Sequence, residues 1–354
     1  MRQNIDHTIW KDALLSELRH AAKLTPDRSV QSIFFGGGTP SLMAPDTVNA
    51  IINEVAKHWR VANDIEITLE ANPTSVEAKK FSDFNAAGIN RVSMGIQALN
   101  DTDLKRLGRL HTAREAMQAF DIAKKYFNRV SFDLIYARQE QSLKNWQSEL
   151  TQALDLTIDH LSLYQLTIEN GTRFGQLYNK GKLTGLPDDD LAADMYQATG
   201  EICENAGLYN YEISNYARKG AESKHNLIYW RYGDYVGIGP GSHGRITVNG
   251  VKQATATPQL PEKWLTCVQS NGYSFETTDK ISHSEQAEEY LMMSLRLVEG
   301  TDLGRFHNLS GRDLSSDNIK ALTEAGLINC KNNRLTASPT GRMILNAILK
   351  ELLV

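Results

Sequence analysis

The chain has 354 residues, of which 41% are hydrophobic, and a formal net charge of -4 at pH 7. A chain of this length exceeds the roughly 250 to 300 residues that one hydrophobic core usually serves, so we expect a main domain with an appendage. The acidic excess argues against a protein that binds nucleic acid through its charge, because such proteins carry a surplus of lysine and arginine.

No apolar run approaches the roughly 18 to 20 residues that span a bilayer, and the first ten residues lack the apolar centre of a signal peptide. We therefore expect a soluble, cytoplasmic protein. The three cysteines, Cys203, Cys267 and Cys330, are widely separated and odd in number. This pattern favours buried free thiols over a disulfide framework or a CxxC-type metal site.

Helices and strands are predicted to alternate through the first 170 residues. An amphipathic helix begins at Asp6, and the series then follows as strands 32–36, 64–72, 91–96, 129–135 and 160–166 with intervening helices 45–59, 76–88, 114–127 and 142–154. Such a series builds a parallel sheet or barrel whose ligands bind at the carboxyl ends of the strands. The series opens with a helix, as though a first strand were missing.

The pattern changes after Gly171. We expect a long helix over 187–207, an aromatic, turn-rich stretch to Gly244, and a hairpin around Asn249 and Gly250. From Ser284, helices are followed by a hairpin over 327–338 and a last helix over 342–353, an order typical of winged-helix-like modules. We therefore divide the chain into a partial barrel, a hairpin with connector and a winged-helix-like module, at 1–250, 251–280 and 281–354. Such modules often bind DNA, but without a basic surplus we predict no nucleic-acid partner.

Two glycine-rich stretches indicate places where the backbone comes close to a ligand or to another segment of the chain. GGGTP, residues 36–40, follows a predicted strand, and glycine there lets main-chain groups reach a ligand with no Cβ in the way. No GK[ST] follows, so the loop is not one that binds nucleoside triphosphates. GPGSHG, residues 239–244, has the GxGxxG spelling, but a strand rather than a helix is predicted after it, so we reject dinucleotide binding.

Polar residues close successive predicted strands, namely Glu70, Gln97, Asp133, Tyr164 and Gln165. Each of them alone is explained as well by capping a helix or hydrogen-bonding a loop. In a barrel-like sheet, however, all would converge with GGGTP at one mouth and surround a polar organic ligand with carboxylate, amide and hydroxyl groups.

The stretches GGGTPSLM, EITLEANP, RVSMGIQALND with LGRLH, FDLIY and LSLYQLTIENGT occur in this order. Together they resemble the radical S-adenosylmethionine proteins related to oxygen-independent coproporphyrinogen III oxidase, over nearly the whole chain, and the heme chaperones among them most of all. The resemblance implies an α/β fold: an incomplete (β/α)6-type partial barrel without its first strand, followed by the winged-helix-like module.

The same resemblance implies a pocket for S-adenosylmethionine. The implied lining residues are Gly37, Gly38, Thr39, Glu70, Gln97, Arg109, Asp133 and Gln165, with Gly239 and Gly241 near the adenosine end. The residue types agree with this ligand, because carbonyls and a carboxylate accept from an ammonium group and arginine pairs with a carboxylate.

HNLIYW, which begins at His225, distinguishes the chaperone branch of the family from the oxidase branch. A histidine beside tyrosine and tryptophan rings offers an axial nitrogen and flat aromatic surface, which suit a heme. A hydrogen-bonded core histidine is the alternative explanation. His243 is a weaker candidate ligand, since a histidine that caps its own turn explains it equally well.

Two departures from the family stand out. Arg138, Gln139 and Glu140 replace a proline and glycine after FDLIY, so this loop is expected to differ in shape. The family motif CxxxCxxC, which binds the 4Fe-4S cluster, is absent, and the three cysteines present cannot replace it. We therefore predict no reductive cleavage of S-adenosylmethionine by this chain, and hypothesise that its start is misplaced or truncated.

Three functions remain open on the sequence. The first is a heme chaperone that passes heme to an unknown acceptor protein, through which it could associate peripherally with a membrane. The second is an oxidase that decarboxylates the propionates of coproporphyrinogen III, and the third is a cluster-free remnant that only keeps the fold. The HNLIYW stretch favours the first. We also expect strand 32–36 to lie at an open edge of the sheet.

Overall fold

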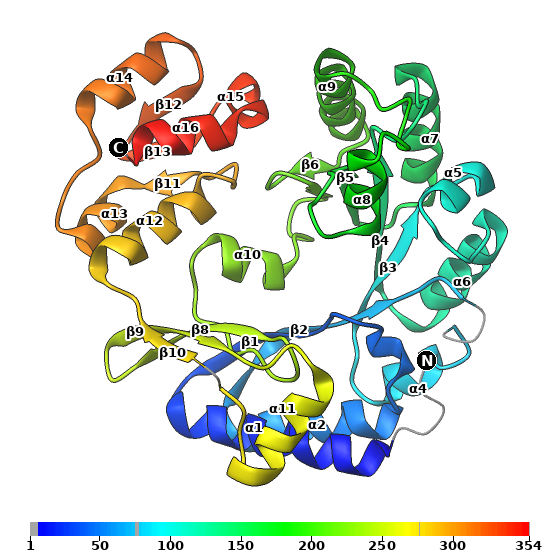
Figure 1. The fold of residues 1–354 in the computed structure, drawn as a ribbon, viewed down its shortest axis with the longest axis vertical. Helices are drawn as coiled ribbons and strands as arrows, with labels where there is room; N and C mark the ends of the chain where they lie inside the picture. The colour runs from blue at the N-terminus through cyan, green and yellow to red at the C-terminus, as the bar shows by residue number, and fades with distance from the viewer. Residues whose placement is uncertain (1–5, 75–77, 276, 354) are drawn as a thin grey trace. The chain divides into compact units, whose positions relative to one another are not determined.

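The computed structural model describes residues 6–74, 78–275 and 277–353 (Figure 1). The chain forms two compact units. Unit 1 comprises Met1–Ile33, Met43–Ile67 and Ser223–Val354, and unit 2 comprises Phe34–Leu42 and Thr68–Glu222. Strands β1 (Ser29–Phe35) and β2 (Arg60–Ala71) begin in unit 1 and end in unit 2.

The largest sheet has seven strands in the order β1-β2-β3-β4-β5-β7-β6. Strands β2 to β5 are parallel neighbours, and β7 and β6 close the sheet as antiparallel strands. The predicted strand and helix series is thus confirmed, and β1 lies at one end of the order, as expected. The strands added within unit 2 are β3 (Arg91–Gln97), β4 (Arg129–Tyr136), β5 (His160–Gln165), β6 (Tyr209–Asn210) and β7 (Asn215–Ala217).

The strands of unit 2 separate apolar from polar side chains by their alternation. Residues such as Val92, Met94, Phe132 and Leu134 are fully buried, while the residues between them are small or polar. Helix α6 packs on β3 and β4, and α7 packs against α9, so they cover the apolar face. The helices of unit 2 are α4 (Phe81–Ala86), α5 (Asp101–Arg106), α6 (Ala113–Tyr126), α7 (Leu143–Leu156), α8 (Arg173–Asn179) and α9 (Asp189–Asn205), with the short 3-10 helix η1 (Pro40–Leu42).

Unit 1 contains helical layers and a small sheet. Helix α1 begins after Asp6, whose carboxylate accepts hydrogen bonds from the N–H groups of Thr8 and Ile9, so the predicted start is confirmed. Trp10 of α1 stacks on Trp264 of α11 with 5.4 Å between ring centroids. The elements are α1 (His7–Leu24), α2 (Pro45–His58), α10 (Lys224–Trp230), β8 (His243–Val248), β9 (Val251–Ala256), α11 (Pro261–Asn271) and β10 (Thr277–Lys280).

The carboxyl-terminal part of unit 1 is the winged-helix-like module. Three helices are followed by the antiparallel hairpin β12–β13, and β11 pairs with β13, as the helix-then-hairpin pattern predicted. The elements are α12 (His283–Ser294), β11 (Thr301–Asp302), α13 (Leu303–Ser310), α14 (Ser316–Glu324), β12 (Ile328–Lys331), β13 (Arg334–Ala337), α15 (Pro339–Met343) and α16 (Leu345–Leu352). The predicted last helix is therefore two helices, because Ile344 leaves the helical conformation with φ -118° and ψ 30°.

Other boundaries differ from the predictions for local reasons. Part of the predicted helix 76–88 lies outside the described residues, and α4 begins only at Phe81. The stretch expected to be turn-rich contains α10, which begins because the Ser223 hydroxyl accepts from the N–H of Asn226. Helix α5 was not predicted; Asn100 caps it by accepting from the N–H of Asp103. Within the described ranges, no helix has the length and apolar character needed to cross a bilayer.

Candidate functional site

The GGGTP loop closes against the end of the neighbouring strand β2. Gly37 and Gly38 have φ values of +77° and +33°, in the region that glycine adopts at low cost. The N–H of Gly37 donates to Oε2 of Glu70 over 3.1 Å. A Cβ on Gly36 would lie 2.5 Å from a ring carbon of Phe34 and 3.3 Å from Oε2 of Glu70. The three glycines therefore bring the loop's main chain directly onto Glu70.

A cavity of about 230 Å³ lies beside this loop, within unit 2. Its walls come from the loop, from the carboxyl ends of β2 to β5 and from the segment after α5. The lining residues are Gly38, Thr39, Pro40, Glu70, Ala71, Asn72, Ser93, Gly95, Gln97, Arg109, Asp133, Ser162 and Tyr164. The structure thus brings together six of the predicted cofactor residues, and Gly37 adjoins them in the chain.

Gln165 is not among these lining residues. It is exposed, and it follows Tyr164 in β5, where successive side chains point to opposite faces of the strand. Ser93, Gly95 and Ser162 line the cavity but were not predicted. The same alternation could have found them, because Gly95 and Ser162 lie two residues, and Ser93 four residues, before a polar residue that closes the strand.

Asp133 is the most perturbed acid of the cavity. Its side chain is partly buried, and its Oδ1 is enclosed with no hydrogen-bond partner in the described part of the chain. Desolvation by burial raises the pKa of Asp133 to about 7, and the nearby Arg109 acts in the opposite direction. The amide Nε2 of Gln97 donates to the other oxygen, Oδ2. Asp133 is thus an acceptor of which one oxygen is unpaired and enclosed.

Glu70 and Arg109 complete the charged groups of the cavity. Burial raises the pKa of Glu70 above its ordinary value, and the hydrogen bond from the N–H of Gly37 offsets only part of this rise. The two carboxylates and the loop carbonyls can accept from an ammonium group or from hydroxyl groups, and Arg109 can pair with a ligand carboxylate. Together these groups suit a small polar ligand that carries both charges.

Gly239 and Gly241 belong to unit 1 and have internal roles there. The N–H of Gly239 donates to Oε2 of Glu17 over 2.8 Å, and the N–H of Gly241 donates to the carbonyl of Pro258 over 2.8 Å. Both have positive φ, +101° and +70°. These contacts account for both glycines as parts of a tight turn, and a role at an adenosine group stays a prediction.

His225 also belongs to unit 1, where it lies partly buried in the first turn of α10. The main-chain N–H of His225 donates to Oε1 of the buried Glu66. The imidazole ring meets the ring of Tyr229 edge-on, with 4.6 Å between centroids. Tyr229 in turn contacts Tyr235 at 4.3 Å. The predicted combination of one imidazole with aromatic rings is therefore present, whereas His243 is exposed at the start of β8.

The cysteines do not fit an iron-sulfur cluster. Cys203 is buried in unit 2, and burial raises the pKa of its thiol to about 12, so it does not offer a thiolate. Cys267 in α11 is partly buried and Cys330 in β12 is exposed, both in unit 1. The expectation of buried thiols is therefore confirmed for Cys203 and wrong for Cys330. Among the residues that the structure describes, no group of three or more histidine, cysteine or acidic side chains could hold a metal ion.

Comparison with known proteins relates the chain to one superfamily. The Radical SAM superfamily matches residues 10–147, and the HemN C-terminal domain matches residues 281–344. The chain is 39% identical over 366 residues to the mitochondrial radical S-adenosyl methionine domain-containing protein 1 of Bos taurus, covering 99% of this chain and 82% of the relative. It is 34% identical over 360 residues to the heme chaperone HemW of Escherichia coli, covering 99% and 91%.

A solved structure shares the fold. The structure of coproporphyrinogen III oxidase (HemN) from Escherichia coli, a radical SAM enzyme, matches with a TM-score of 0.80 and 19% identity, covering 99% of this chain and 84% of that one. This likeness confirms the predicted fold, a partial barrel of the radical SAM type with a carboxyl-terminal module. Since relatives 31–39% identical match along nearly its whole length, the chain belongs to the radical S-adenosylmethionine family that contains the heme chaperone HemW.

Proposed function

We propose that this protein is a HemW-like heme chaperone that binds S-adenosylmethionine in the unit 2 cavity and heme at His225. The observation that carries the proposal is the convergence of the GGGTP loop, Glu70, Gln97, Arg109 and Asp133 on one cavity. Relatives named heme chaperone HemW, 31–36% identical over 95% or more of this chain, support the chaperone part.

In the proposed complex each end of the ligand meets a matching group. Glu70 and the loop carbonyls accept from the methionyl ammonium, and Arg109 pairs with the carboxylate. Gln97 and Asp133, which both line the cavity, are the groups that we assign to the ribose hydroxyls. Bound S-adenosylmethionine would supply a sulfonium group, but the cysteines do not fit the cluster that reduces it, so we propose binding without cleavage. Detection of 5′-deoxyadenosine would contradict this.

Binding can be measured without any cluster. Isothermal titration of the full chain with S-adenosylhomocysteine, which keeps the ammonium, carboxylate and ribose groups, should give saturable binding. A Glu70→Gln variant should bind more weakly, because a neutral amide attracts the ammonium less. Absence of binding by the unaltered protein would overturn the S-adenosylmethionine part of the proposal.

The heme part rests on His225 with Tyr229 and Tyr235. An imidazole nitrogen can ligate heme iron, and tyrosine rings provide apolar surface for the porphyrin. Titration with hemin should shift the Soret band, and the shift should be lost in His225→Ala but kept in His243→Ala. Retention in His225→Ala with loss in His243→Ala would move the ligand to the exposed histidine and refute our assignment.

The alternative function, oxidation of coproporphyrinogen III, is supported by likeness of fold to the oxidase structure alone, at 19% identity. Incubation with coproporphyrinogen, a reductant and S-adenosylmethionine should leave the substrate unchanged, and formation of protoporphyrinogen would favour the oxidase. The heme acceptor and location in the cytoplasm stay predictions.

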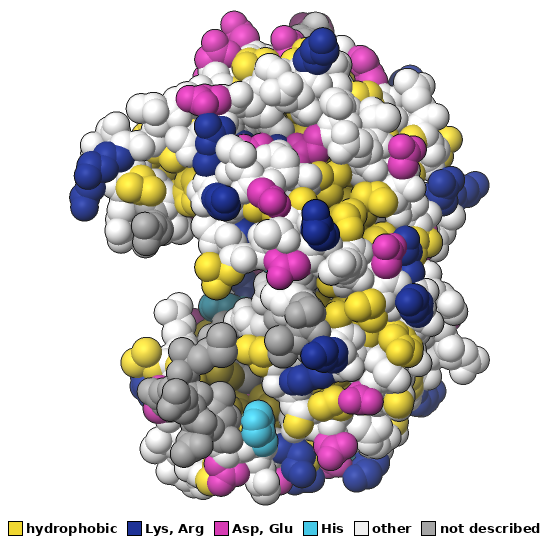
Figure 2. All heavy atoms as spheres, turned by 90° about the vertical axis from the view of Figure 1, so that its right-hand side faces the viewer, with side chains coloured by type: hydrophobic (Ala, Val, Ile, Leu, Met, Phe, Trp, Pro, Cys, Tyr) yellow, Lys and Arg dark blue, Asp and Glu magenta, His cyan; other side chains and the backbone are white. Residues whose placement is uncertain are grey.

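On the face shown in Figure 2, lysine and arginine side chains lie interspersed with acidic ones. The prediction that nucleic acid is not a partner rests on the net charge of -4.

A further inference from the structure

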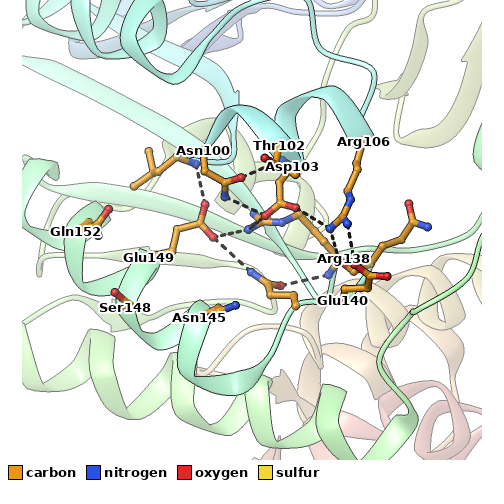
Figure 3. A pocket seen from close by; sticks show the side chains of 13 residues that line it. Asn100, Thr102, Asp103, Arg106, Arg138, Glu140, Asn145, Ser148, Glu149 and Gln152 are labelled. Atoms are coloured by element: carbon orange, nitrogen blue, oxygen red, sulfur yellow. Dashed lines mark hydrogen bonds and ion pairs between the residues drawn. The ribbon is translucent and has the colours of Figure 1, made fainter.

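A second cavity, of about 370 Å³, lies in unit 2. Its walls come from α5 and the segment before it, from the loop after β4, and from α7 (Figure 3). Arg138 crosses this region with a side chain that is only 3% exposed. It belongs to the loop after β4 that contains Arg138, Gln139 and Glu140, for which the sequence led us to expect a different shape.

Arg138 makes contacts in two directions. Nη2 donates to Oδ2 of Asp103 over 2.9 Å and to Oε2 of Glu149. Nη1 donates to the carbonyl of Ile135 over 2.7 Å and, over 3.5 Å, to the carbonyl of Gln97. Its Nε is buried and has no hydrogen-bond partner in the described structure. Buried ion pairs with an unsatisfied donor contribute little net stability, so this cluster is better explained by the geometry that it enforces.

The geometry in question is that of Gln97. Its φ is +75°, an unfavourable value for a residue with a Cβ, and the pairing of β3 with β4 shifts register there. Arg138 holds the carbonyl of Gln97, and two residues later Oε1 of Glu149 accepts from the N–H of Leu99 over 2.7 Å. In this conformation the side chain of Gln97 donates to Asp133 in the ligand cavity.

The same cluster fixes helix α5. Asp103, which pairs with Arg138, lies in α5 and also accepts from Nδ2 of its capping residue Asn100 over 2.9 Å. The N–H of Arg109 donates to the carbonyl of Leu104 in this helix over 2.8 Å. A displacement of α5 would therefore displace the arginine that lines the ligand cavity.

We infer that Arg138 and Glu149 form a positioning pair that holds Gln97 in its left-handed conformation and thereby sets the affinity of the neighbouring cavity for its ligand. This inference rests on the proposed function only for the identity of the ligand. Neither Arg138 nor Glu149 lines the ligand cavity. The pair acts on the cavity indirectly, through the contacts of Arg138 with Gln97 and with Asp103 of α5.

The test uses a charge-neutral change. The double variant Arg138→Gln/Glu149→Gln removes two opposite buried charges together. Asp103 loses Arg138 as a partner but keeps Arg106, whose Nη1 lies 3.5 Å from its Oδ1. The matched control is Arg106→Gln/Glu140→Gln, an exposed pair at the rim of the same cavity with 2.8 Å between Arg106 Nη2 and Glu140 Oε2. We expect S-adenosylhomocysteine affinity to fall roughly tenfold in the double variant and to stay within about twofold in the control.

Action through Gln97 has its own readout. In a Gln97→Ala background the double variant should cause a clearly smaller further loss of affinity, which is the part that acts through α5 and Arg109. The Asp133 carboxyl can also be titrated without ligand by NMR with ¹³C-labelled aspartate, assigned with Asp133→Asn. Asp133 is faced by Arg109, Glu70 and Tyr164 as well as by Gln97. Loss of the Gln97 hydrogen bond should raise its midpoint, whereas the rim control should leave the midpoint unchanged.

The outcomes separate the two proposals. If the unaltered protein binds ligand but neither affinity nor the Asp133 midpoint changes in the double variant, the positioning role is wrong. If the protein does not bind S-adenosylhomocysteine while the midpoint still moves, the ligand assignment fails and the positioning of Gln97 stands. Should the double variant not fold, Glu149→Gln alone keeps the acceptor for Leu99 and is judged by the same two measurements.

Discussion

Replacing Asp133 by asparagine should stabilise the protein at alkaline pH. On folding, the pKa of this carboxyl rises from its ordinary value of 3.8 to about 7, because burial penalises the charged form. The folded protein therefore binds more protons than the unfolded chain between these pH values. Its stability consequently falls as the pH rises from about 4 through about 7. Asp133→Asn removes this loss.

The magnitude follows from the size of the shift. A shift of about three pKa units corresponds to about 4 kcal/mol. We expect a gain of about 2 kcal/mol at pH 8, because the side chain borders a cavity that admits water and is only partly buried. At pH 4 the variant and the unaltered protein should be nearly equal, since the carboxyl is then protonated in the folded state.

Urea denaturation followed by circular dichroism at pH 4, 6 and 8 measures the effect. Asp155→Asn, at an exposed position of α7, is the control and should show no such trend. Equal stability of Asp133→Asn and the unaltered protein at pH 8, or a difference that does not change with pH, would refute a raised pKa at this site.

Three further changes test the structure. Glu17→Ala should lower the free energy of unfolding by roughly 3 to 5 kcal/mol, because four hydrogen bonds from three segments of unit 1 end on this buried carboxylate; urea denaturation measures the loss. Gly36→Ala should weaken S-adenosylhomocysteine binding in isothermal titration, because the new Cβ would displace Phe34 and press on Glu70. Arg109→Leu should weaken binding of S-adenosylhomocysteine much more than that of 5′-methylthioadenosine, because only the first ligand carries a carboxylate to pair with arginine.

For each of these changes, a specific outcome or control would contradict the prediction. A loss below about 1 kcal/mol for Glu17→Ala would mean that its partners find water instead. Gly200→Ala, in helix α9 with open space around it, is the control for Gly36→Ala and should leave binding unchanged. Equal losses for both nucleosides in Arg109→Leu would assign that residue to the adenosine part of the ligand or to the fold.

The sequence was sufficient for features whose cause is local. Alternating apolar residues in strands such as 129–135 encode one buried face, and the order of strands and helices favoured a parallel sheet. The triple glycine marked a place of close backbone approach, which the structure shows to be against Glu70. Polar residues at strand ends indicated the cavity, because parallel strands bring their carboxyl ends to one edge.

Only the tertiary structure decided features that join distant segments. The side chains of Ser162 and Tyr164 line the cavity and that of Gln165 does not. Which face of β5 lines the cavity depends on the register in which β5 pairs with β4. Residue 97 has a left-handed backbone conformation although it is glutamine and not glycine, so the sequence does not indicate it. The hydrogen bond from Arg138 to its carbonyl joins residues 41 positions apart. Side chains that meet across such separations are selected by strand register and helix packing. Local sequence patterns record which face of an element is apolar, but not which partner lies against it.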